Sequence, residues 1–107
     1  MDVIAERHLE LRVAGGSVPV SVKLGRPKSG ASGEDWVCEY EVWFGDSCRS
    51  MAMHGVDAMQ ALQLSIATLD VELQHGARKR KGSLYHYDEP FVSILEGGSL
   101  RVVPGAA

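Results

Sequence analysis

The sequence predicts an α+β fold in which an antiparallel sheet of two β-hairpins, with four or more strands in all, packs against one long α-helix. Before Gly55, apolar and polar residues alternate in two pairs of segments, and a period of 2 is typical of strands with one buried face. After Gly55, apolar residues recur every three or four positions, as in a helix with one buried stripe: Met59, Leu62, Ile66, Leu69 and Leu73. A chain of 107 residues fits a single domain, residues 1–107.

The first hairpin is predicted over residues 4–13 and 17–24, with Gly15-Gly16 as its turn. Glycine accepts the positive φ that two-residue hairpin turns require. The register that follows places three apolar pairs on one face: Val13 with Val18, Leu11 with Val20, and Leu9 with Val22. Pro19 has no N–H to donate to a neighbouring strand, so we expect the second strand to lie at a sheet edge.

The second hairpin is predicted over residues 36–44 and 47–54, with Gly45-Asp46 as its turn. This turn places Cys38 opposite Met53 and Cys48 opposite Trp43. The two cysteines then lie on opposite faces and well beyond the Cα separation of about 7 Å that a disulfide tolerates. Free thiols fit a reducing compartment. Residues 25–35, rich in Gly, Ser and charge, predict a flexible loop between the hairpins.

The helix is predicted over residues 58–75, with Asp57 as N-cap, Gln60 completing a weak capping box and Gly76 as the left-handed C′ residue. Leu64 and Val71 widen its apolar stripe. We therefore expect cover on a second side, from the C-terminal segment or from a second subunit. Residues 82–107 form a variable tail, either irregular or a third hairpin with its turn near residues 97–98.

Composition favours a soluble cytoplasmic protein. Apolar residues make up 45% of the chain, charged residues 23%, and the formal net charge is -3. A net negative charge disfavours a polyanionic partner. The sequence shows neither a run long enough to cross a bilayer nor the basic and apolar start of a signal peptide. Nucleic acid and membrane are therefore the less favoured partners, and another protein the more favoured one.

Catalytic and metal-binding motifs are weak. The only local cluster of metal-ligand types, His86 with Asp88 and Glu89, is more typical of a polar loop. Glu39 and Glu41 stand about 7 Å apart on one strand face, which suits acid–base chemistry but equally a solvated strand. We predict no catalytic residue, no cofactor and no metal, and an enzyme or metal-binding protein is the least favoured class.

Two surfaces suggest binding. An outward-facing Trp43 beside Glu39 and Glu41 has the composition of an interface hot spot with a polar rim; alternatively, the C-terminal segment covers Trp43. The preferred function is a non-enzymatic protein-interaction domain, of the immunity (toxin-neutralising) type or another partner-binding type, with a homodimer left open. The alternative is a nucleic-acid site built from a basic run and two tyrosines: Arg78, Lys79, Arg80, Lys81, Tyr85 and Tyr87. The basic run also has a structural interpretation, because each cation near a helix C-terminus stabilises it by about 0.3–1 kcal/mol.

Four segments resemble a family of small bacterial proteins catalogued only as a domain of unknown function: Ile4-Ala5-Glu6-Arg7, Gly25-Arg26-Pro27, Trp36-Val37-Cys38-Glu39-Tyr40 and Gly55-Val56-Asp57-Ala58-Met59-Gln60-Ala61-Leu62. The resemblance covers residues 4 to about 75, and the segment after Gly82 matches poorly. It implies a bacterial source and a fold of four strands and a helix. It implies no activity and assigns no catalytic residue.

Overall fold

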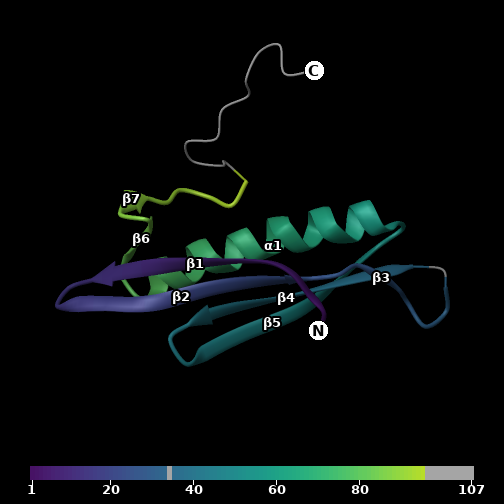
Figure 1. The fold of residues 1–107 in the computed structure, drawn as a ribbon, viewed down its shortest axis with the longest axis horizontal. Helices are drawn as coiled ribbons and strands as arrows, with labels where there is room; N and C mark the ends of the chain where they lie inside the picture. Colours follow the sequence, from purple (N-terminus) through teal and green to yellow (C-terminus); the bar gives the residue numbers. More distant parts are fainter. Residues whose placement is uncertain (34, 96–107) are drawn as a thin grey trace, which may run out of the picture.

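The computed structural model describes residues 1–33 and 35–95. Within them the fold has two layers, an antiparallel sheet of seven strands and one helix along one face of it (Figure 1), which confirms the predicted fold class. The elements are β1 (Val3–Val13), β2 (Gly16–Gly25), β3 (Lys28–Ser29), β4 (Trp36–Phe44), β5 (Ser47–Gly55), α1 (Ala58–Lys79), β6 (Ser83–His86) and β7 (Glu89–Pro90). β5 forms one edge and pairs with β4; β2 and the short β3 lie on the other side of β4, followed by β1, β6 and β7.

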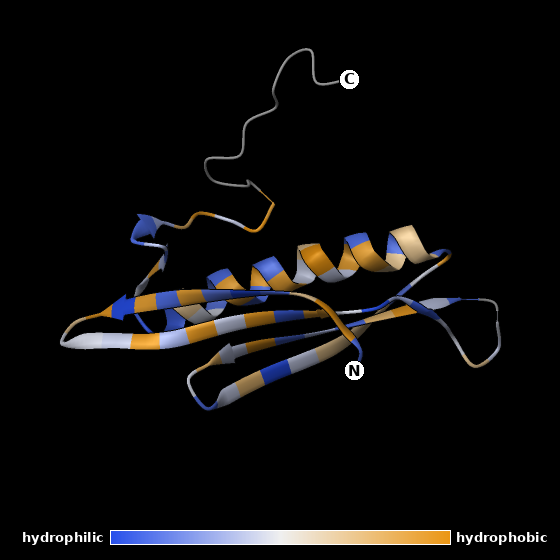
Figure 2. Ribbon diagram, viewed as in Figure 1, coloured by the Kyte–Doolittle hydropathy of each residue, from blue (hydrophilic) through white to orange (hydrophobic). Residues whose placement is uncertain are grey.

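The core lies between α1 and the sheet face made by alternate strand residues, an alternation visible in Figure 2. It consists of Leu9, Leu11, Val20, Val22, Tyr40, Val42, Phe44, Leu69, Leu73, Ala77 and Leu84. The buried stripe of the helix is displaced from the predicted one, because Ala61 and Ser65 are buried whereas Met59 is 63% exposed. Small residues let the first half of the helix approach the sheet, and the Ser65 hydroxyl donates to the Cys38 carbonyl at 2.8 Å.

The first hairpin has the predicted apolar face but a different register. Val13 pairs with Gly16 and Leu11 with Val18, so the two-residue turn is Ala14-Gly15 and the predicted Gly15-Gly16 turn is wrong. The positive φ falls on Gly15, at +87°, and the second central position is where type II turns place glycine. Each β1 residue pairs with a β2 residue two positions earlier than predicted. Because the shift is an even number, the same side chains stay on the buried face.

The prediction that the second strand lies at an edge is also wrong, because β2 pairs with β1 on one side and β4 on the other. The ladder with β4 begins at Val20, one residue after Pro19. The Pro19 carbonyl accepts a hydrogen bond from the Gly45 N–H at 2.8 Å. The N and O of one strand residue point to the same side, so the nitrogen of Pro19 also points toward the β4 side. It lies beyond the end of the ladder, where no hydrogen bond of the ladder requires its N–H.

The second hairpin has the predicted register along its whole length. Phe44 pairs with Ser47 across the Gly45-Asp46 turn, Trp43 with Cys48, and Cys38 with Met53. Both cysteines are free, as expected. The segment 25–35 was predicted as a loop, but it contains β3, which pairs with the first residues of β4.

The helix begins where predicted. Asp57 is the N-cap and accepts a hydrogen bond from the Gln60 N–H at 2.7 Å, while the Gln60 side chain accepts from the Val56 N–H at 2.7 Å. The helix does not end where predicted, because it continues through Gly76 to Lys79. A Cβ on Gly76 would lie 2.6 Å from Cζ of Phe44, so this glycine permits close packing on β4 rather than terminating the helix.

Lys81 takes the C′ role instead, with φ of +54°. The Lys81 N–H donates to the Arg78 carbonyl and the Gly82 N–H to the Ala77 carbonyl, both at 3.0 Å. This is the Schellman pattern of hydrogen bonds, and it sends the chain back toward the sheet, where β6 pairs with β1.

The described part of the C-terminal segment forms a hairpin of β6 and β7. Tyr87 and Asp88 both have positive φ, +50° and +63°, which is typical of a type I′ turn. The chain then covers one flank of α1, because the Ile94 N–H donates to Asp70 at 2.9 Å and the Gln74 side chain donates to the Val92 carbonyl at 2.6 Å. The hairpin predicted near residues 97–98 lies outside the described residues.

Candidate functional site

The candidate site lies on the sheet face that points away from α1, which we call the outer face. On β4 the side chains of Val37, Glu39, Glu41 and Trp43 alternate with the buried core residues, and all four are only partly buried. An antiparallel sheet commonly leaves one face to solvent. Among the described residues, α1 and the segment after β7 both pack on the opposite face.

Trp43 is held at a defined position on the outer face. Its indole N–H donates to the Glu41 carboxylate at 3.1 Å, and the strand pairings place it between Ser21 of β2 and Cys48 of β5. Its ring therefore stands among small side chains. Glu39 is paired with Lys28 of β3 at 3.3 Å, so both carboxylates beside Trp43 are already held by neighbours.

The C-terminal segment, as far as it is described, does not reach Trp43. Ile94 lines a hollow with Val22, Leu24, Ile66 and Leu69, which belong to the core side of the sheet and to α1. Within residues 1–33 and 35–95, Trp43 therefore lies on a face that no other segment covers.

The basic run is divided between two surfaces. Arg78 lines a hollow with Tyr85, whereas Lys79 and Arg80 line a different hollow of about 160 Å³ together with Arg49 of β5. Consecutive helical residues point in directions about 100° apart, so four basic residues in a row do not make one patch. Lys81 follows in the C′ position.

Two cations of this second hollow already have partners in the fold. The Arg80 guanidinium lies 4.2 Å from the centre of the Phe44 ring and donates to the Gly76 carbonyl at 3.2 Å. Arg49 lies 3.6 Å from Glu72. The geometry thus gives both cations a structural role, and for Arg80 this role agrees with the stabilising effect of positive charge near a helix C-terminus.

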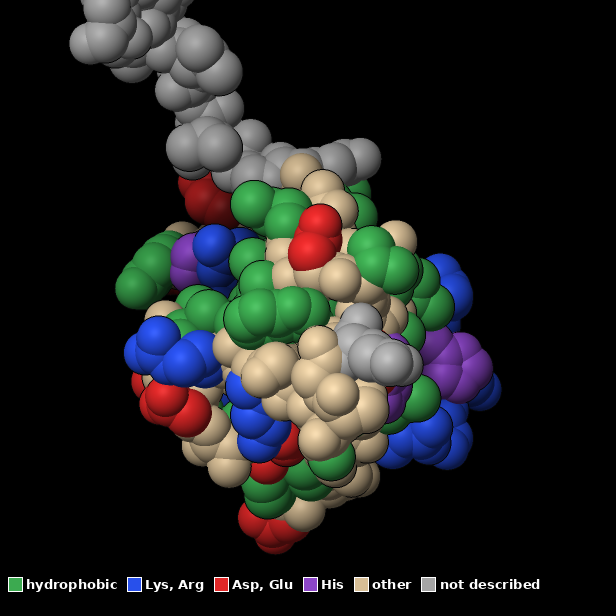
Figure 3. Space-filling view, turned by 90° about the vertical axis from the view of Figure 1, so that its right-hand side faces the viewer, with side chains coloured by type: hydrophobic (Ala, Val, Ile, Leu, Met, Phe, Trp, Pro, Cys, Tyr) green, Lys and Arg blue, Asp and Glu red, His purple; other side chains and the backbone are tan. Residues whose placement is uncertain are grey.

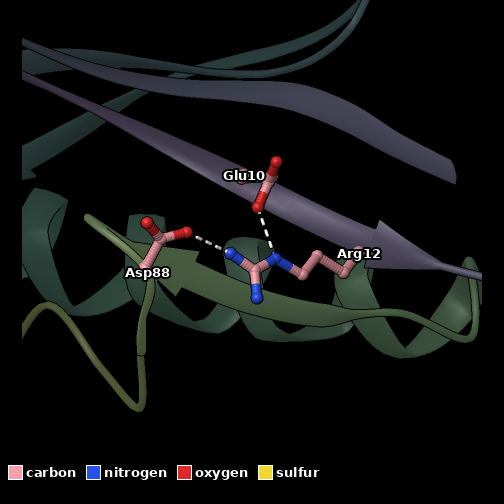
Figure 4. A network of polar contacts seen from close by, with 3 residues as sticks. All are labelled: Glu10, Arg12 and Asp88. Atoms are coloured by element: carbon pink, nitrogen blue, oxygen red, sulfur yellow. Dashed lines mark hydrogen bonds and ion pairs between the residues drawn. The ribbon is translucent and has the colours of Figure 1, made fainter.

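The two tyrosines of the nucleic-acid alternative lie apart from these cations. Tyr87 is 89% exposed at the β6–β7 turn. Tyr85 carries the Arg12 guanidinium 3.8 Å from its ring centre, and Arg12 also binds Glu10 and Asp88 (Figure 4). One face of Tyr85 is therefore occupied by a side chain of the same chain.

Cysteine and metal chemistry find little support in the geometry. Cys38 is buried, and its thiol donates to the Gly25 carbonyl at 3.4 Å. Cys48 is exposed, but partial burial and the neighbouring Glu41 raise the pKa of its thiol, with Lys23 opposing them. Across residues 1–33 and 35–95 there is no group of three or more His, Cys, Asp or Glu side chains that could hold a metal ion.

A sequence model described as "Domain of unknown function (DUF6968)" matches residues 5–92. The chain belongs to this family. No curated protein and no solved structure matches it. The match continues past residue 75, where the resemblance seen in the sequence ends, and takes in the β6–β7 hairpin.

The DUF6968 domain therefore includes all of the sheet except the first two residues of β1, with both of its edges. In the part of the chain that the structure describes, no helix is long and apolar enough to span a membrane. The end of the molecule at the start of α1 shows a further group of hydrophobic side chains (Figure 3), and Val56 and Met59 there are 77% and 63% exposed. Exposed apolar side chains are common on protein surfaces, so we rank this end below the outer face.

Sequence reasoning missed one feature, the edge that β5 forms in the described part of the sheet. A signal was present in the small residues of this strand, Ser47, Cys48, Ser50 and Ala52. Such residues bury little surface, as expected of a strand at the margin of a core. The pattern of one hairpin does not reveal which of its strands faces outward, because that depends on the pairing of β4 with β2.

Proposed function

We propose that this DUF6968 domain is a non-enzymatic protein-interaction domain that binds a partner protein through the outer face around Trp43. The observation that carries the proposal is a partly exposed tryptophan, fixed by Glu41, on a face that the described chain leaves open. Tryptophan is enriched among interface hot spots because it buries a large area at a small cost in side-chain entropy. Glu39 and Glu41 supply the polar rim, and residues 25–33 with β3 lie beside it.

A more specific form of the proposal is an immunity-type role in a bacterial cell, in which the bound partner is a toxic protein. It is supported by analogy with small acidic interaction domains that act by covering a partner, an analogy of class and not of site. The outer face would then cover the active surface of the toxin, and no chemistry by this chain would be required.

The test compares three tagged baits in lysate of the source organism: wild type, Trp43→Ala and Tyr87→Asn. Tyr87 is the matched control, because it is an exposed aromatic residue at the far edge of the sheet, and asparagine tolerates its positive φ. We expect a stoichiometric protein with wild type and Tyr87→Asn that is lost with Trp43→Ala. Equal recovery with all three baits would contradict the proposal.

A second variant tests the polar rim without removing the Trp43 side chain. Glu41→Gln keeps the Trp43 ring and removes one rim charge, and rim charges act mainly on association rates. With the purified partner we expect slower association at low salt and little change in dissociation. For the immunity-type form, expression of the partner alone should arrest growth, and co-expression of wild type but not Trp43→Ala should restore it.

The nucleic-acid alternative receives less support from the geometry, because the basic run divides between two hollows and Tyr85 is stacked by Arg12. Recovery of nucleic acid with the wild-type bait before nuclease treatment, and of no protein after it, would favour this alternative instead.

A further inference from the structure

The two edges of the sheet are built differently. At one edge, β7 has only two residues, of which one is Pro90. At the other, β5 has nine residues that pair with β4 in one continuous register without a bulge. Proteins normally protect an edge by making it short, by proline, by bulges or by charges. β5 has none of the first three, and Arg49 is its only Lys, Arg, Asp or Glu residue.

Among the described residues no strand pairs with the outer side of β5, and the backbone groups that point to that side can be assigned from the hairpin geometry. The pair that closes a two-residue hairpin, Phe44 with Ser47, is a hydrogen-bonded pair, and hydrogen-bonded pairs recur at every second position. Odd-numbered residues of β5 therefore direct their N–H and C=O groups toward β4. Cys48, Ser50, Ala52 and His54 direct theirs outward, away from the sheet.

The outward groups fit a second copy of the same strand. If two β5 strands pair in antiparallel about a two-fold axis at Met51, Ser50 faces Ala52 of the other copy and Cys48 faces His54 of the other copy. All four outward residues then form hydrogen-bonded pairs. Met51, which is 48% exposed, meets its own copy in the close, non-hydrogen-bonded position.

The position of α1 fits the same arrangement. The helix packs chiefly over β4 and β5, so its axis lies about half a strand spacing inside β5. With strands about 4.8 Å apart, two copies joined at β5 would bring their helix axes to roughly 10 Å, which is the usual distance between packed helices. A different sheet order, with α1 over β1 and β2, would leave a wide gap.

The flank of the helix that faces this gap has the spacing of a helix–helix seam. Leu64, Thr68, Val71 and His75 recur at steps of four, three and four, as in the seam of a coiled coil. Leu64 is 38% and Val71 64% exposed, whereas the opposite flank is covered by the segment after β7. Glu72, which is paired with Arg49, lies next to this seam.

We propose that the chain forms a two-fold symmetric homodimer in which the β5 strands pair to make one continuous sheet and the α1 helices pack side by side. Nine strand residues and four helical ones on each side are about half the number in a standard interface. Interfaces of this size are typical of weak, transient association, so we expect the balance of monomer and dimer to depend on concentration. This inference goes beyond the proposed function and does not depend on the outer face.

The test measures the mass of the full chain by sedimentation across a range of micromolar concentrations. Wild type should move from 11.6 kDa toward twice that mass. Met51→Lys and Met51→Glu should each weaken self-association at least about a hundredfold, because like charges then meet on the axis. A mixture of the two variants should form heterodimers, because opposite charges meet there instead. Tyr87→Lys, at the far edge, should behave as wild type.

A disulfide trap checks the register. Met51→Cys in a Cys48→Ser background places two thiols at a Cα separation of about 4.5 Å, within disulfide range. Mild oxidation should yield a covalent dimer, whereas Tyr87→Cys in the same background should not. A wild type that stays at 11.6 kDa throughout overturns the proposal. So does a dimer that Met51→Lys leaves intact, since β5 would then not be the contact.

Discussion

Replacement of Gly55 by alanine tests how the helix is held on the sheet. Gly55 is buried at the end of β5. A Cβ there would lie 2.9 Å from the carbonyl carbon of Gln60 and 3.0 Å from Cα of Ala61, whereas ordinary contacts begin at 3.4 Å. Both atoms belong to the helix backbone, and the backbone nitrogen of Ala61 would lie closer still, so the first turn of α1 must move by well over half an ångström. Overpacking of this kind costs about 1–3 kcal/mol.

The opposing effect is smaller. Alanine restricts the unfolded chain more than glycine and thereby stabilises the fold by about 0.4–1 kcal/mol. The net expectation for Gly55→Ala is a loss of about 1–2 kcal/mol in the free energy of unfolding, and for a domain of this size a fall in Tm of roughly 5–15 °C. The assay is thermal and urea denaturation followed by circular dichroism of the helix.

Gly16→Ala is the matched control, because Gly16 has open space around its Cβ position and no positive φ. It should leave Tm unchanged or raise it slightly. If Gly55→Ala unfolds at or above the wild-type Tm, the close approach of β5 and the first turn of α1 does not constrain the helix, and the reasoning from the Gly55 contacts is refuted.

Three further predictions concern single side chains. Ser65→Ala removes the hydrogen bond to the buried Cys38 carbonyl and should lower the free energy of unfolding by about 1 kcal/mol in urea titrations. Alkylation of Cys48 by iodoacetamide should require a higher pH than alkylation of an unperturbed cysteine, because burial and Glu41 raise the pKa of the Cys48 thiol. Glu41→Gln should move the pH profile of the alkylation rate to lower pH, and an unmoved profile would exclude an effect of the Glu41 charge. Lys79→Gln, which keeps the contact of Arg80 with Phe44, should leave any binding of single-stranded RNA at physiological salt unchanged; loss of binding in a gel-shift titration would favour the nucleic-acid alternative.

The sequence predicted what depends on near neighbours. The register of the second hairpin follows from one unambiguous turn, Gly45-Asp46, and the start of α1 from one capping residue, Asp57. The first turn was misplaced because adjacent glycines, Gly15 and Gly16, permit two loops that bury the same face. Local pattern cannot choose between them, since both satisfy the hydrophobic period.

The sequence did not predict what depends on contacts between distant elements. Gly76 has the sequence context of a helix C-terminus. Glycine is needed there because a Cβ would collide with the ring of Phe44, which lies 32 positions earlier in the chain. β6 is a strand because β1 offers it a pairing edge. For the site, the period of β4 predicts that Trp43 points outward, but whether another segment covers it depends on the path of the chain after α1.

The two proposals have a joint consequence. A two-fold axis through paired β5 strands is perpendicular to the sheet, so both outer faces lie on the same side of the dimer. The two Trp43 residues would be three strand spacings apart and offset by six residues along the strands, which gives about 25 Å. A two-fold symmetric partner can then bind both sites at once, and its avidity would exceed the affinity of one site.

Met51→Lys distinguishes the two kinds of partner. Because Met51 lies on the face opposite Trp43, the substitution breaks the dimer without touching the site. A symmetric partner should bind this variant much more weakly than wild type, whereas a monovalent partner should bind it equally well. Wild-type affinity for a partner shown to be dimeric would mean that the two Trp43 sites act separately, even if the homodimer exists.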